Sequence, residues 1–247
     1  MSWMCITVLL LLCNAVPVAP ADGAQDAARF YDKYHSKRGS NQCAACGHGI
    51  AAVRLFKEAR SILDAGAGNC KFVRELLAGG YDVRGIELSG LVLQRDCQDL
   101  LANGTVREGS LHQLPFSDNQ FDVVTSWEVL EHVPMKLTPV IIKELIRVSK
   151  GLLLMTISLR LSIKDHEDHP STHINVHPHA WWDGQFAAQG CVPMEDMLGK
   201  LFMVSRHERK RLHKLLMPQL KQRGPLYSNV QDGVGEPWYF AYSCEKR

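Results

Sequence analysis

The stretch ILDAGAGNC, residues 62–70, decides the fold of this chain. Two aliphatic residues lead into Asp64, and glycines then alternate with alanine at Gly66 and Gly68. Such a stretch typically ends a buried strand, turns tightly and begins a helix, because glycine adopts backbone conformations that other residues avoid. In an open parallel sheet, ligands bind beyond the carboxyl ends of the strands. We therefore expect Gly66 and Gly68 to lie where the backbone closely approaches a ligand.

Strand and helix patterns alternate from this stretch onward. Apolar strand segments are expected at residues 61–66, 81–89, 105–110, 121–127 and 152–158, with helical segments at 71–80, 90–104 and 139–151 between them. Apolar strands joined by helices are typical of a parallel sheet that is covered on both faces. A helix over 179–190 and an alternating strand over 237–245 follow. The sequence thus predicts an α/β fold, a Rossmann-like, doubly wound, mostly parallel seven-stranded sheet with an antiparallel C-terminal edge strand.

The chain divides into three segments: 1–23, 24–60 and 61–247. Residues 4–18 are apolar except for Thr7 and Asn14, a run shorter than the ~20 residues of a membrane span. Ala19-Pro20-Ala21 then fits a signal-peptidase pattern. We interpret residues 1–23 as a secretory signal peptide, with an uncleaved anchor as the alternative. Residues 24–60 are expected to form a helical lead-in, with helices on either side of the loop NQCAACGHG, and residues 61–247 to form the main domain.

The cysteines and one glycosylation triplet favour an oxidising compartment. Six cysteines remain once the leader is removed, and Asn103-Gly104-Thr105 is an N-glycosylation acceptor. We expect structural disulfides, without assigning partners, rather than a redox or zinc role for the Cys43 and Cys46 pair. The net charge is only +2, and the basic run at 206–214 has no aromatic platform, so a nucleic-acid partner is not expected. The predicted location is the secretory pathway, either the lumen or outside the cell.

The ligand of the glycine loop follows from its neighbours in the sequence. Lys71 stands where dinucleotide-binding loops carry a third glycine, which argues against NAD and FAD. Glu87 ends the second predicted strand and could accept both hydroxyls of a ribose. The segments DAGAG, IELS and EGSLHQLPFSDNQFDVVTSWEVLEH resemble those of the class I S-adenosylmethionine-dependent methyltransferases, especially their small-molecule and glycan branch. The resemblance covers residues 62–157.

The resemblance implies S-adenosylmethionine as the cofactor and a set of residues around it. Glu87 would bind the ribose, and Ser110 with Leu111 would flank the adenine. Trp127 and Glu128 would line the methionine end of the cofactor, with His132 on the acceptor side. The cofactor residues that the resemblance implies are Asp64, Gly66, Gly68, Glu87, Ser110, Leu111, Trp127 and Glu128.

Methyl transfer to a hydroxyl group requires a base near neutral pH, which favours histidine. The catalytic candidates are His132, His169 and His173, the last two within the His-rich loop KDHEDHPSTHINVHPH. Three interpretations of this loop are open. It supplies the acceptor base, it binds a divalent metal that coordinates a sugar diol, or it is a solvated loop with no catalytic role. Its spacing matches no fixed metal motif, so we favour an acceptor-lining loop and predict no metal ligand.

These observations predict an S-adenosylmethionine-dependent O-methyltransferase of the secretory pathway. Its acceptor is expected to be a glycan hydroxyl, including those of sialic acids. The alternatives are a small-molecule O-methyltransferase and a non-catalytic, methyltransferase-like binding module. No stable membrane insertion is expected if the leader is cleaved.

Overall fold

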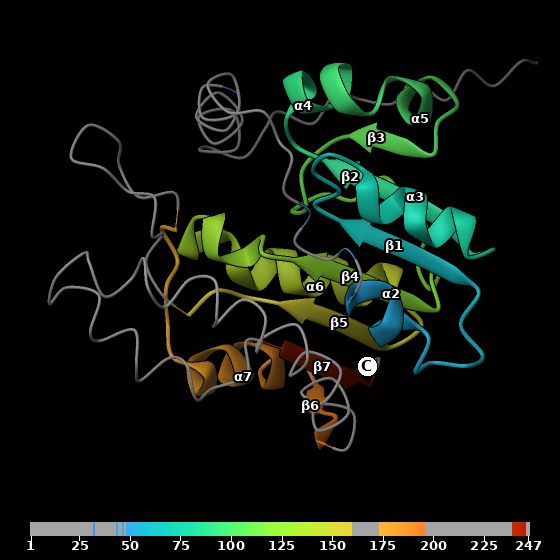
Figure 1. Ribbon diagram of the computed structural model, residues 1–247. Helices are drawn as coiled ribbons and strands as arrows, with labels where there is room; N and C mark the ends of the chain where they lie inside the picture. The colour runs from blue at the N-terminus through green and yellow to red at the C-terminus, as the bar shows by residue number, and fades with distance from the viewer. Residues whose placement is uncertain are drawn as a thin grey trace, which may run out of the picture.

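The computed structural model describes residues 32, 43 and 46 and the ranges 48–159, 173–195 and 239–245. A single seven-stranded sheet with the strand order β3-β2-β1-β4-β5-β7-β6 forms its centre (Figure 1). The strands are β1 Ser61–Ala65, β2 Asp82–Glu87, β3 Val106–Glu108, β4 Val123–Trp127, β5 Leu152–Thr156, β6 Cys191–Pro193 and β7 Tyr239–Cys244.

The first five strands are parallel, and the last two are antiparallel additions. β1 pairs in parallel with both β2 and β4, so the strand order reverses beside the glycine-rich stretch. β7 runs antiparallel to β5, with Leu154 opposite Ala241. The predicted doubly wound, mostly parallel sheet is therefore confirmed.

The C-terminal strand differs from the prediction in one respect, because β7 lies inside the sheet and β6 forms its outer edge. Cys191 pairs with Cys244 across the two antiparallel strands. No sequence pattern indicated β6, since three residues are too few to show alternation. Pro193 fits this position because an edge strand can lack one backbone donor.

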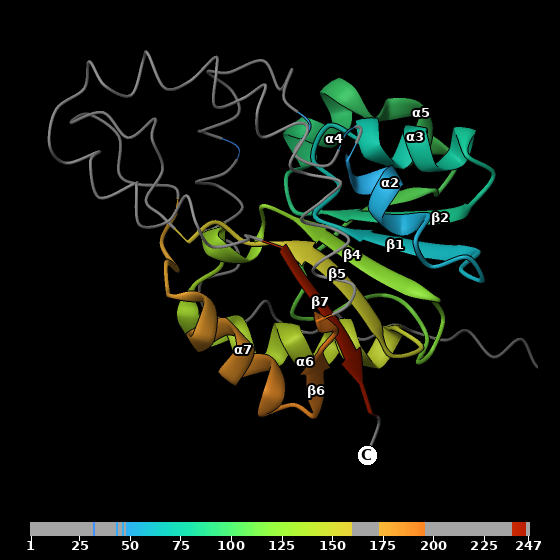
Figure 2. The same cartoon turned by 60° about the horizontal axis from the view of Figure 1, so that its bottom comes forward.

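Helices cover both faces of the sheet. The helices are α2 His48–Val53, α3 Lys71–Ala78, α4 Gly90–Asp96, α5 Gln98–Ala102, α6 Thr138–Val148 and α7 His179–Ala187, with short 3-10 helices η1 Leu130–His132 and η2 Met135–Leu137. Figure 2 shows α6 and α7 on one side of the sheet and α2 to α5 on the other. Ile142, Trp182 and Phe186 are buried in the first layer, and Phe72 and Leu93 in the second. The buried faces of the helices thus match the two apolar faces of the strands.

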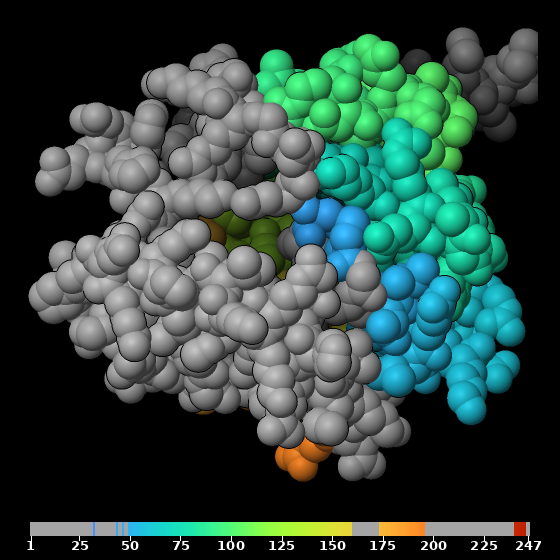
Figure 3. All heavy atoms as spheres, viewed as in Figure 1, coloured from blue at the N-terminus to red at the C-terminus, as the bar shows by residue number. Residues whose placement is uncertain are grey.

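The lead-in forms its helix earlier than predicted. The sequence VRLFKEARS was expected to be helical, but α2 ends at Val53 and turns follow over residues 54–58. Ala52 and Val53 are buried, whereas Lys57 and Glu58 are exposed. α2 packs against α3 (Figure 3), so the helix lies almost entirely before the segment that was predicted to be helical. The leader and, apart from residues 32, 43, 46 and 48–60, the lead-in lie outside the described residues.

Three disulfides join the six cysteines that follow the leader. Cys43 bonds Cys46, Cys70 bonds Cys97, and Cys191 bonds Cys244. The predicted helix over 90–104 is divided at Cys97, whose backbone leaves the helical region at φ −129°. Within the described part of the chain, no helix combines the length and apolar character needed to cross a bilayer.

Candidate functional site

The glycine-rich loop connects β1 to α3 at the carboxyl edge of the parallel strands. Gly66 and Gly68 have φ angles of +95° and +51°, which favour glycine. The Gly66 amide donates a 2.9 Å hydrogen bond to the carbonyl of Ile86, which ties the loop to β2. A Cβ atom added to Gly68 would meet no heavy atom of the described residues within 4 Å. The loop therefore presents bare backbone to open space at this point, which fits close approach by a ligand.

Glu87 lies beside this open backbone at the end of β2. Its Oε2 atom accepts a 2.7 Å hydrogen bond from the Gly68 amide, and its Oε1 atom accepts a 2.9 Å bond from the Ser89 amide. Burial raises the pKa of Glu87, and these backbone donors oppose that rise. Each carboxylate oxygen retains a second lone pair. The position and remaining acceptor capacity of Glu87 fit a ribose diol.

The lead-in contributes a residue that the sequence did not reveal. The Ser89 hydroxyl donates a 2.5 Å hydrogen bond to Asp32 and accepts one from the Val92 amide at the start of α4. Asp32 thus stands next to the predicted ribose site, although it precedes Ser89 by 57 residues. Its sequence neighbourhood shows only an amphipathic helix, and nothing there marks it as a site residue.

Asp64 lies below the loop rather than on its surface. Its side chain is 2% exposed and accepts a 3.2 Å hydrogen bond from the Thr125 hydroxyl on β4. Burial raises the pKa of Asp64 to about 8, and the nearby Glu87 carboxylate adds to that rise. This shift favours the protonated form of Asp64 at neutral pH.

Three of the residues predicted to surround the cofactor have other contacts in the structure. Ser110 shares a 2.6 Å hydrogen bond with Nδ1 of His112. Leu111 is buried in the core cluster that also contains Ile142 and Leu145 of α6. Trp127 is 5% exposed and meets the ring of Phe72 edge-on, with 5.5 Å between ring centroids. Direct contact of these three side chains with the cofactor stays a prediction.

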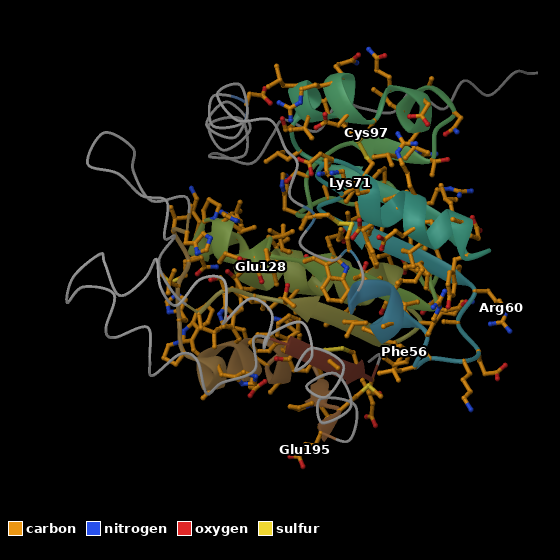
Figure 4. All side chains as sticks on the ribbon, viewed as in Figure 1. Phe56, Arg60, Lys71, Cys97, Glu128 and Glu195 are labelled. Atoms are coloured by element: carbon orange, nitrogen blue, oxygen red, sulfur yellow. A yellow bond between two sulfur atoms is a disulfide. The ribbon has the colours of Figure 1, made fainter. Side chains whose placement is uncertain are left out.

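The turn after β4 presses against the glycine loop. A Cβ atom on Gly66 would lie 2.4 Å from Cγ2 of Val129, so the two segments are in direct contact. The preceding residue, Glu128, has a φ of +55°, and its amide donates a 3.0 Å hydrogen bond to the carbonyl of Thr156. Figure 4 shows Glu128 beyond the carboxyl end of β4, with Phe56 and Arg60 at the opposite end of the sheet.

Two of the three catalytic candidates come together next to this turn. The ring centroids of His132 and His173 are 4.7 Å apart, and the two rings are nearly perpendicular. Ligand atoms of Glu131, His132 and His173 all lie within 4.8 Å of one another. We call these three residues the acceptor cluster. His169 lies outside the described residues, and Glu131 is a member that the sequence analysis did not select.

Asn175 places His173 in this cluster. The amides of Ile174 and Asn175 both donate 2.9 Å hydrogen bonds to the Glu131 carbonyl. The buried Asn175 side chain donates further bonds to the Leu130 carbonyl and to the Thr138 hydroxyl. The end of the His-rich loop is therefore anchored to the turn after β4.

The other described histidines of this loop pack against aromatic rings. His177 stacks on Trp181 with 3.7 Å between ring centroids. His179 stacks on Phe240, and its Nδ1 atom is 2.9 Å from the Asp183 carboxylate. The His179 contact joins α7 to β7, and the His177 contact joins the segment before α7 to that helix.

Comparisons with known proteins bear on the domain and on its fold. Residues 63–154 match the family model described as "Methyltransferase domain". No curated protein matches the sequence of this chain.

Solved structures share the fold at low sequence identity. A Pyrococcus horikoshii OT3 protein is 18% identical, with a TM-score of 0.51 and coverage of 66% of this chain and 84% of that one. A Haemonchus contortus phosphoethanolamine N-methyltransferase, in complex with phosphomonomethylethanolamine and S-adenosylhomocysteine, is 17% identical with a TM-score of 0.56. That match covers 89% of this chain and 61% of the worm enzyme, so this chain spans less than two thirds of its length.

A third structure, magnesium protoporphyrin IX methyltransferase from Synechocystis PCC 6803 with bound S-adenosylmethionine, is 17% identical with a TM-score of 0.50. The match covers 71% of this chain and 89% of the cyanobacterial one. Residues 63–154 thus match a methyltransferase domain, and the strand order of the sheet agrees with the fold of the S-adenosylmethionine-dependent methyltransferases found among these structures.

Proposed function

We propose that this enzyme transfers a methyl group from S-adenosylmethionine to a hydroxyl group of a glycan or another small acceptor in the secretory pathway. The observation that carries the proposal is the contact between Gly66 and Val129. It places the glycine loop, which fits the cofactor, beside the turn that bears Glu131 and His132. A donor site and a group of proton-accepting side chains thus share one edge of the sheet.

The residues of the loop fit the cofactor in chemical type. Gly68 offers open backbone, and Glu87 offers carboxylate acceptors to a ribose. Asp64, once ionised, would place a negative charge below the loop, which suits a cofactor that carries a sulfonium cation. The bound cofactor would supply an electrophilic methyl group with a good leaving group.

The acceptor cluster provides what the hydroxyl group needs. The oxygen of the acceptor forms a bond to the methyl carbon, the carbon–sulfur bond breaks, and its electron pair stays on sulfur. The hydroxyl proton must then leave, and imidazole groups accept protons near neutral pH. We assign activation of the hydroxyl to the cluster that contains His132 and His173, with His169 as a further candidate from the same loop.

The proposed compartment is supported by the cysteine pairing. All six cysteines that follow the predicted leader form disulfides in the structure, and disulfides persist mainly in oxidising compartments. Asn103 is exposed at the end of α5, where a glycan would have room. Glycan hydroxyls, including those of sialic acids, are the acceptors most available to a lumenal enzyme.

A small-molecule acceptor is the second candidate. The neighbouring worm and cyanobacterial structures are named for small-molecule substrates, which supports this alternative. Incubation of the mature protein with radiolabelled S-adenosylmethionine and a mixed panel of glycans, free sugars and phenols would separate the candidates. Label in the glycan fraction supports the first, and label in free sugars or phenols supports the second.

The same preparation tests whether the domain is catalytic at all. Titration with S-adenosylmethionine should show binding at micromolar concentrations. If no binding occurs at high micromolar concentrations, the domain is a methyltransferase-like binding module and the proposed activity is wrong.

A further inference from the structure

The acceptor cluster places two imidazole groups and one carboxylate around a common point. η1 carries Glu131 and His132, and the hydrogen bonds of Ile174 and Asn175 to the Glu131 carbonyl bring His173 opposite them. One ligand atom from each of the three side chains lies within 4.8 Å of the other two. An ion equidistant from three atoms at that greatest separation would be about 2.8 Å from each, against about 2.0–2.2 Å for ordinary zinc ligands. A shift of less than about 1 Å for each side chain would therefore complete the coordination.

The carboxyl group of Glu131 is buried without a counter-charge. The residue is 0% exposed, and neither carboxylate oxygen has a hydrogen-bond partner among the described residues. The neighbouring Glu128 is also an acid and supplies no counter-charge. A buried carboxyl group without partners costs free energy, and a bound cation would offset that cost.

We propose that Glu131, His132 and His173 bind a divalent transition-metal ion. Two nitrogen ligands and one carboxylate suit zinc, manganese, iron, cobalt or nickel, whereas magnesium and calcium prefer oxygen ligands throughout. Three protein ligands leave coordination positions open, as in catalytic rather than structural metal sites. This proposal departs from the prediction made from the sequence, which was an acceptor-lining loop without metal ligands.

The metal has a direct use in the proposed reaction, and this step rests on the proposed function. An acceptor hydroxyl that occupies an open position would have a lower pKa, because the cation stabilises the alkoxide. Its proton would pass to water, and the oxygen would keep the electron pair that forms the new bond to the methyl carbon. A neighbouring hydroxyl of a sugar could occupy a second open position. In this arrangement His132 and His173 activate the hydroxyl group as metal ligands and not as proton acceptors, and the acceptor class is a vicinal diol.

The test uses the mature protein, purified without a histidine tag, stripped with a chelator and titrated with Co²⁺ as the probe. We expect one equivalent of Co²⁺ with visible absorption bands, and a rise in melting temperature on binding. Loss of partners that merely orient ligands lowers metal affinity by about 10- to 100-fold, so Glu131→Gln and His173→Asn should lower it at least as much. His177→Asn, a change in the same segment, should leave affinity unchanged.

Thermal stability and Co²⁺ affinity, measured together, distinguish loss of the metal site from a folding defect. The metal-free Glu131→Gln variant should be at least as thermally stable as the wild type, because a neutral amide replaces a buried carboxyl group. The metal site is overturned if the wild type binds no Co²⁺, or if Glu131→Gln binds it as tightly as the wild type, which would place the ion on other histidines of the loop. Metal binding without methyl transfer to any hydroxyl acceptor would instead overturn the proposed function and leave the site standing.

Discussion

Cys70 is bonded to Cys97, and this disulfide fixes the far end of the glycine loop. Cys70 precedes α3 in a left-handed backbone conformation with a φ of +59°, and Cys97 lies at the junction of α4 and α5. The two sulfur atoms lie 3.7 and 3.4 Å from the Gly68 carbonyl oxygen. The bond therefore holds the loop and the helix that follows Glu87 in one arrangement.

We expect the double variant Cys70→Ser with Cys97→Ser to lose both stability and cofactor affinity. The chain-entropy estimate for a loop of this length is about 3 to 4 kcal/mol of unfolding free energy. Chemical denaturation and S-adenosylmethionine titration would measure the two effects. Cys191→Ser with Cys244→Ser is the matched control, since that disulfide joins β6 to β7. It should lower stability alone, and equal losses of cofactor affinity in both variants would contradict a specific role for the Cys70 bond.

Gly68→Ala should weaken S-adenosylmethionine binding at a small cost in stability. The added methyl group would point into the open space above the loop, and the positive φ would cost about 1–2 kcal/mol. Gly104→Ala provides the comparison, because Gly104 also has a positive φ, +74°, and no neighbour within 4 Å. Calorimetric titration should show reduced affinity for the first variant and unchanged affinity for the second. Similar affinities in the two would place the cofactor elsewhere.

Glu87→Gln should reduce cofactor affinity by about tenfold or more, since a hydrogen bond to a charged group contributes about 1.5–3 kcal/mol. The substitution keeps the size of the side chain, but one amide oxygen cannot serve both the Gly68 and Ser89 donors and a ribose. Fluorescence or calorimetric titration would measure the change. Glu58→Gln, an exposed substitution before β1, should bind as the wild type does. Unchanged affinity in Glu87→Gln would disprove the ribose assignment.

Asp64→Asn should remove a pH-dependent loss of stability from the ligand-free protein. The pKa of Asp64 is raised from 3.8 to about 8 in the folded state, so between these values the native chain keeps a proton that the unfolded chain releases. Stability must then fall as pH rises through this window, by up to about 1.4 kcal/mol per pH unit. The melting temperature of Asp64→Asn relative to the wild type should increase from pH 5 to pH 8.

Asp122 is the control for this experiment, because its pKa is shifted in the opposite direction and stability should therefore change with pH in the opposite sense. Burial alone would raise the pKa of Asp122, but hydrogen bonds from Lys150, Ser61 and Arg60 hold it below its usual value. Its carboxylate therefore stabilises the fold above the unfolded pKa, and this contribution is lost as pH falls through the folded pKa. Asp122→Asn should lower the melting temperature at pH 7. Parallel pH profiles for the two variants would contradict the assigned protonation of Asp64.

The sequence by itself determined the parallel sheet, its doubly wound form and the position of the glycine loop. These features are local: apolar runs that suit buried strands, helices with one apolar face, and glycines where the backbone must turn. The positions of Asp64 and Glu87 near the ends of β1 and β2, and of Gly66 and Gly68 in the loop after β1, followed from the same patterns. The interior position of β7 and the short strand β6 could not be predicted, since strand order depends on pairing between distant segments.

Only the tertiary structure decided which distant side chains meet at the site. It joined Cys70 to Cys97, placed Asp32 against Ser89, and brought His173 to Glu131 and His132. Each of these contacts spans 27 or more residues of sequence, and no periodicity within one segment encodes a partner in another. The burial of individual side chains likewise depends on the tertiary structure. Nothing in the sequence distinguishes Glu131 from other acidic residues, whereas its complete burial in the fold makes it a candidate metal ligand.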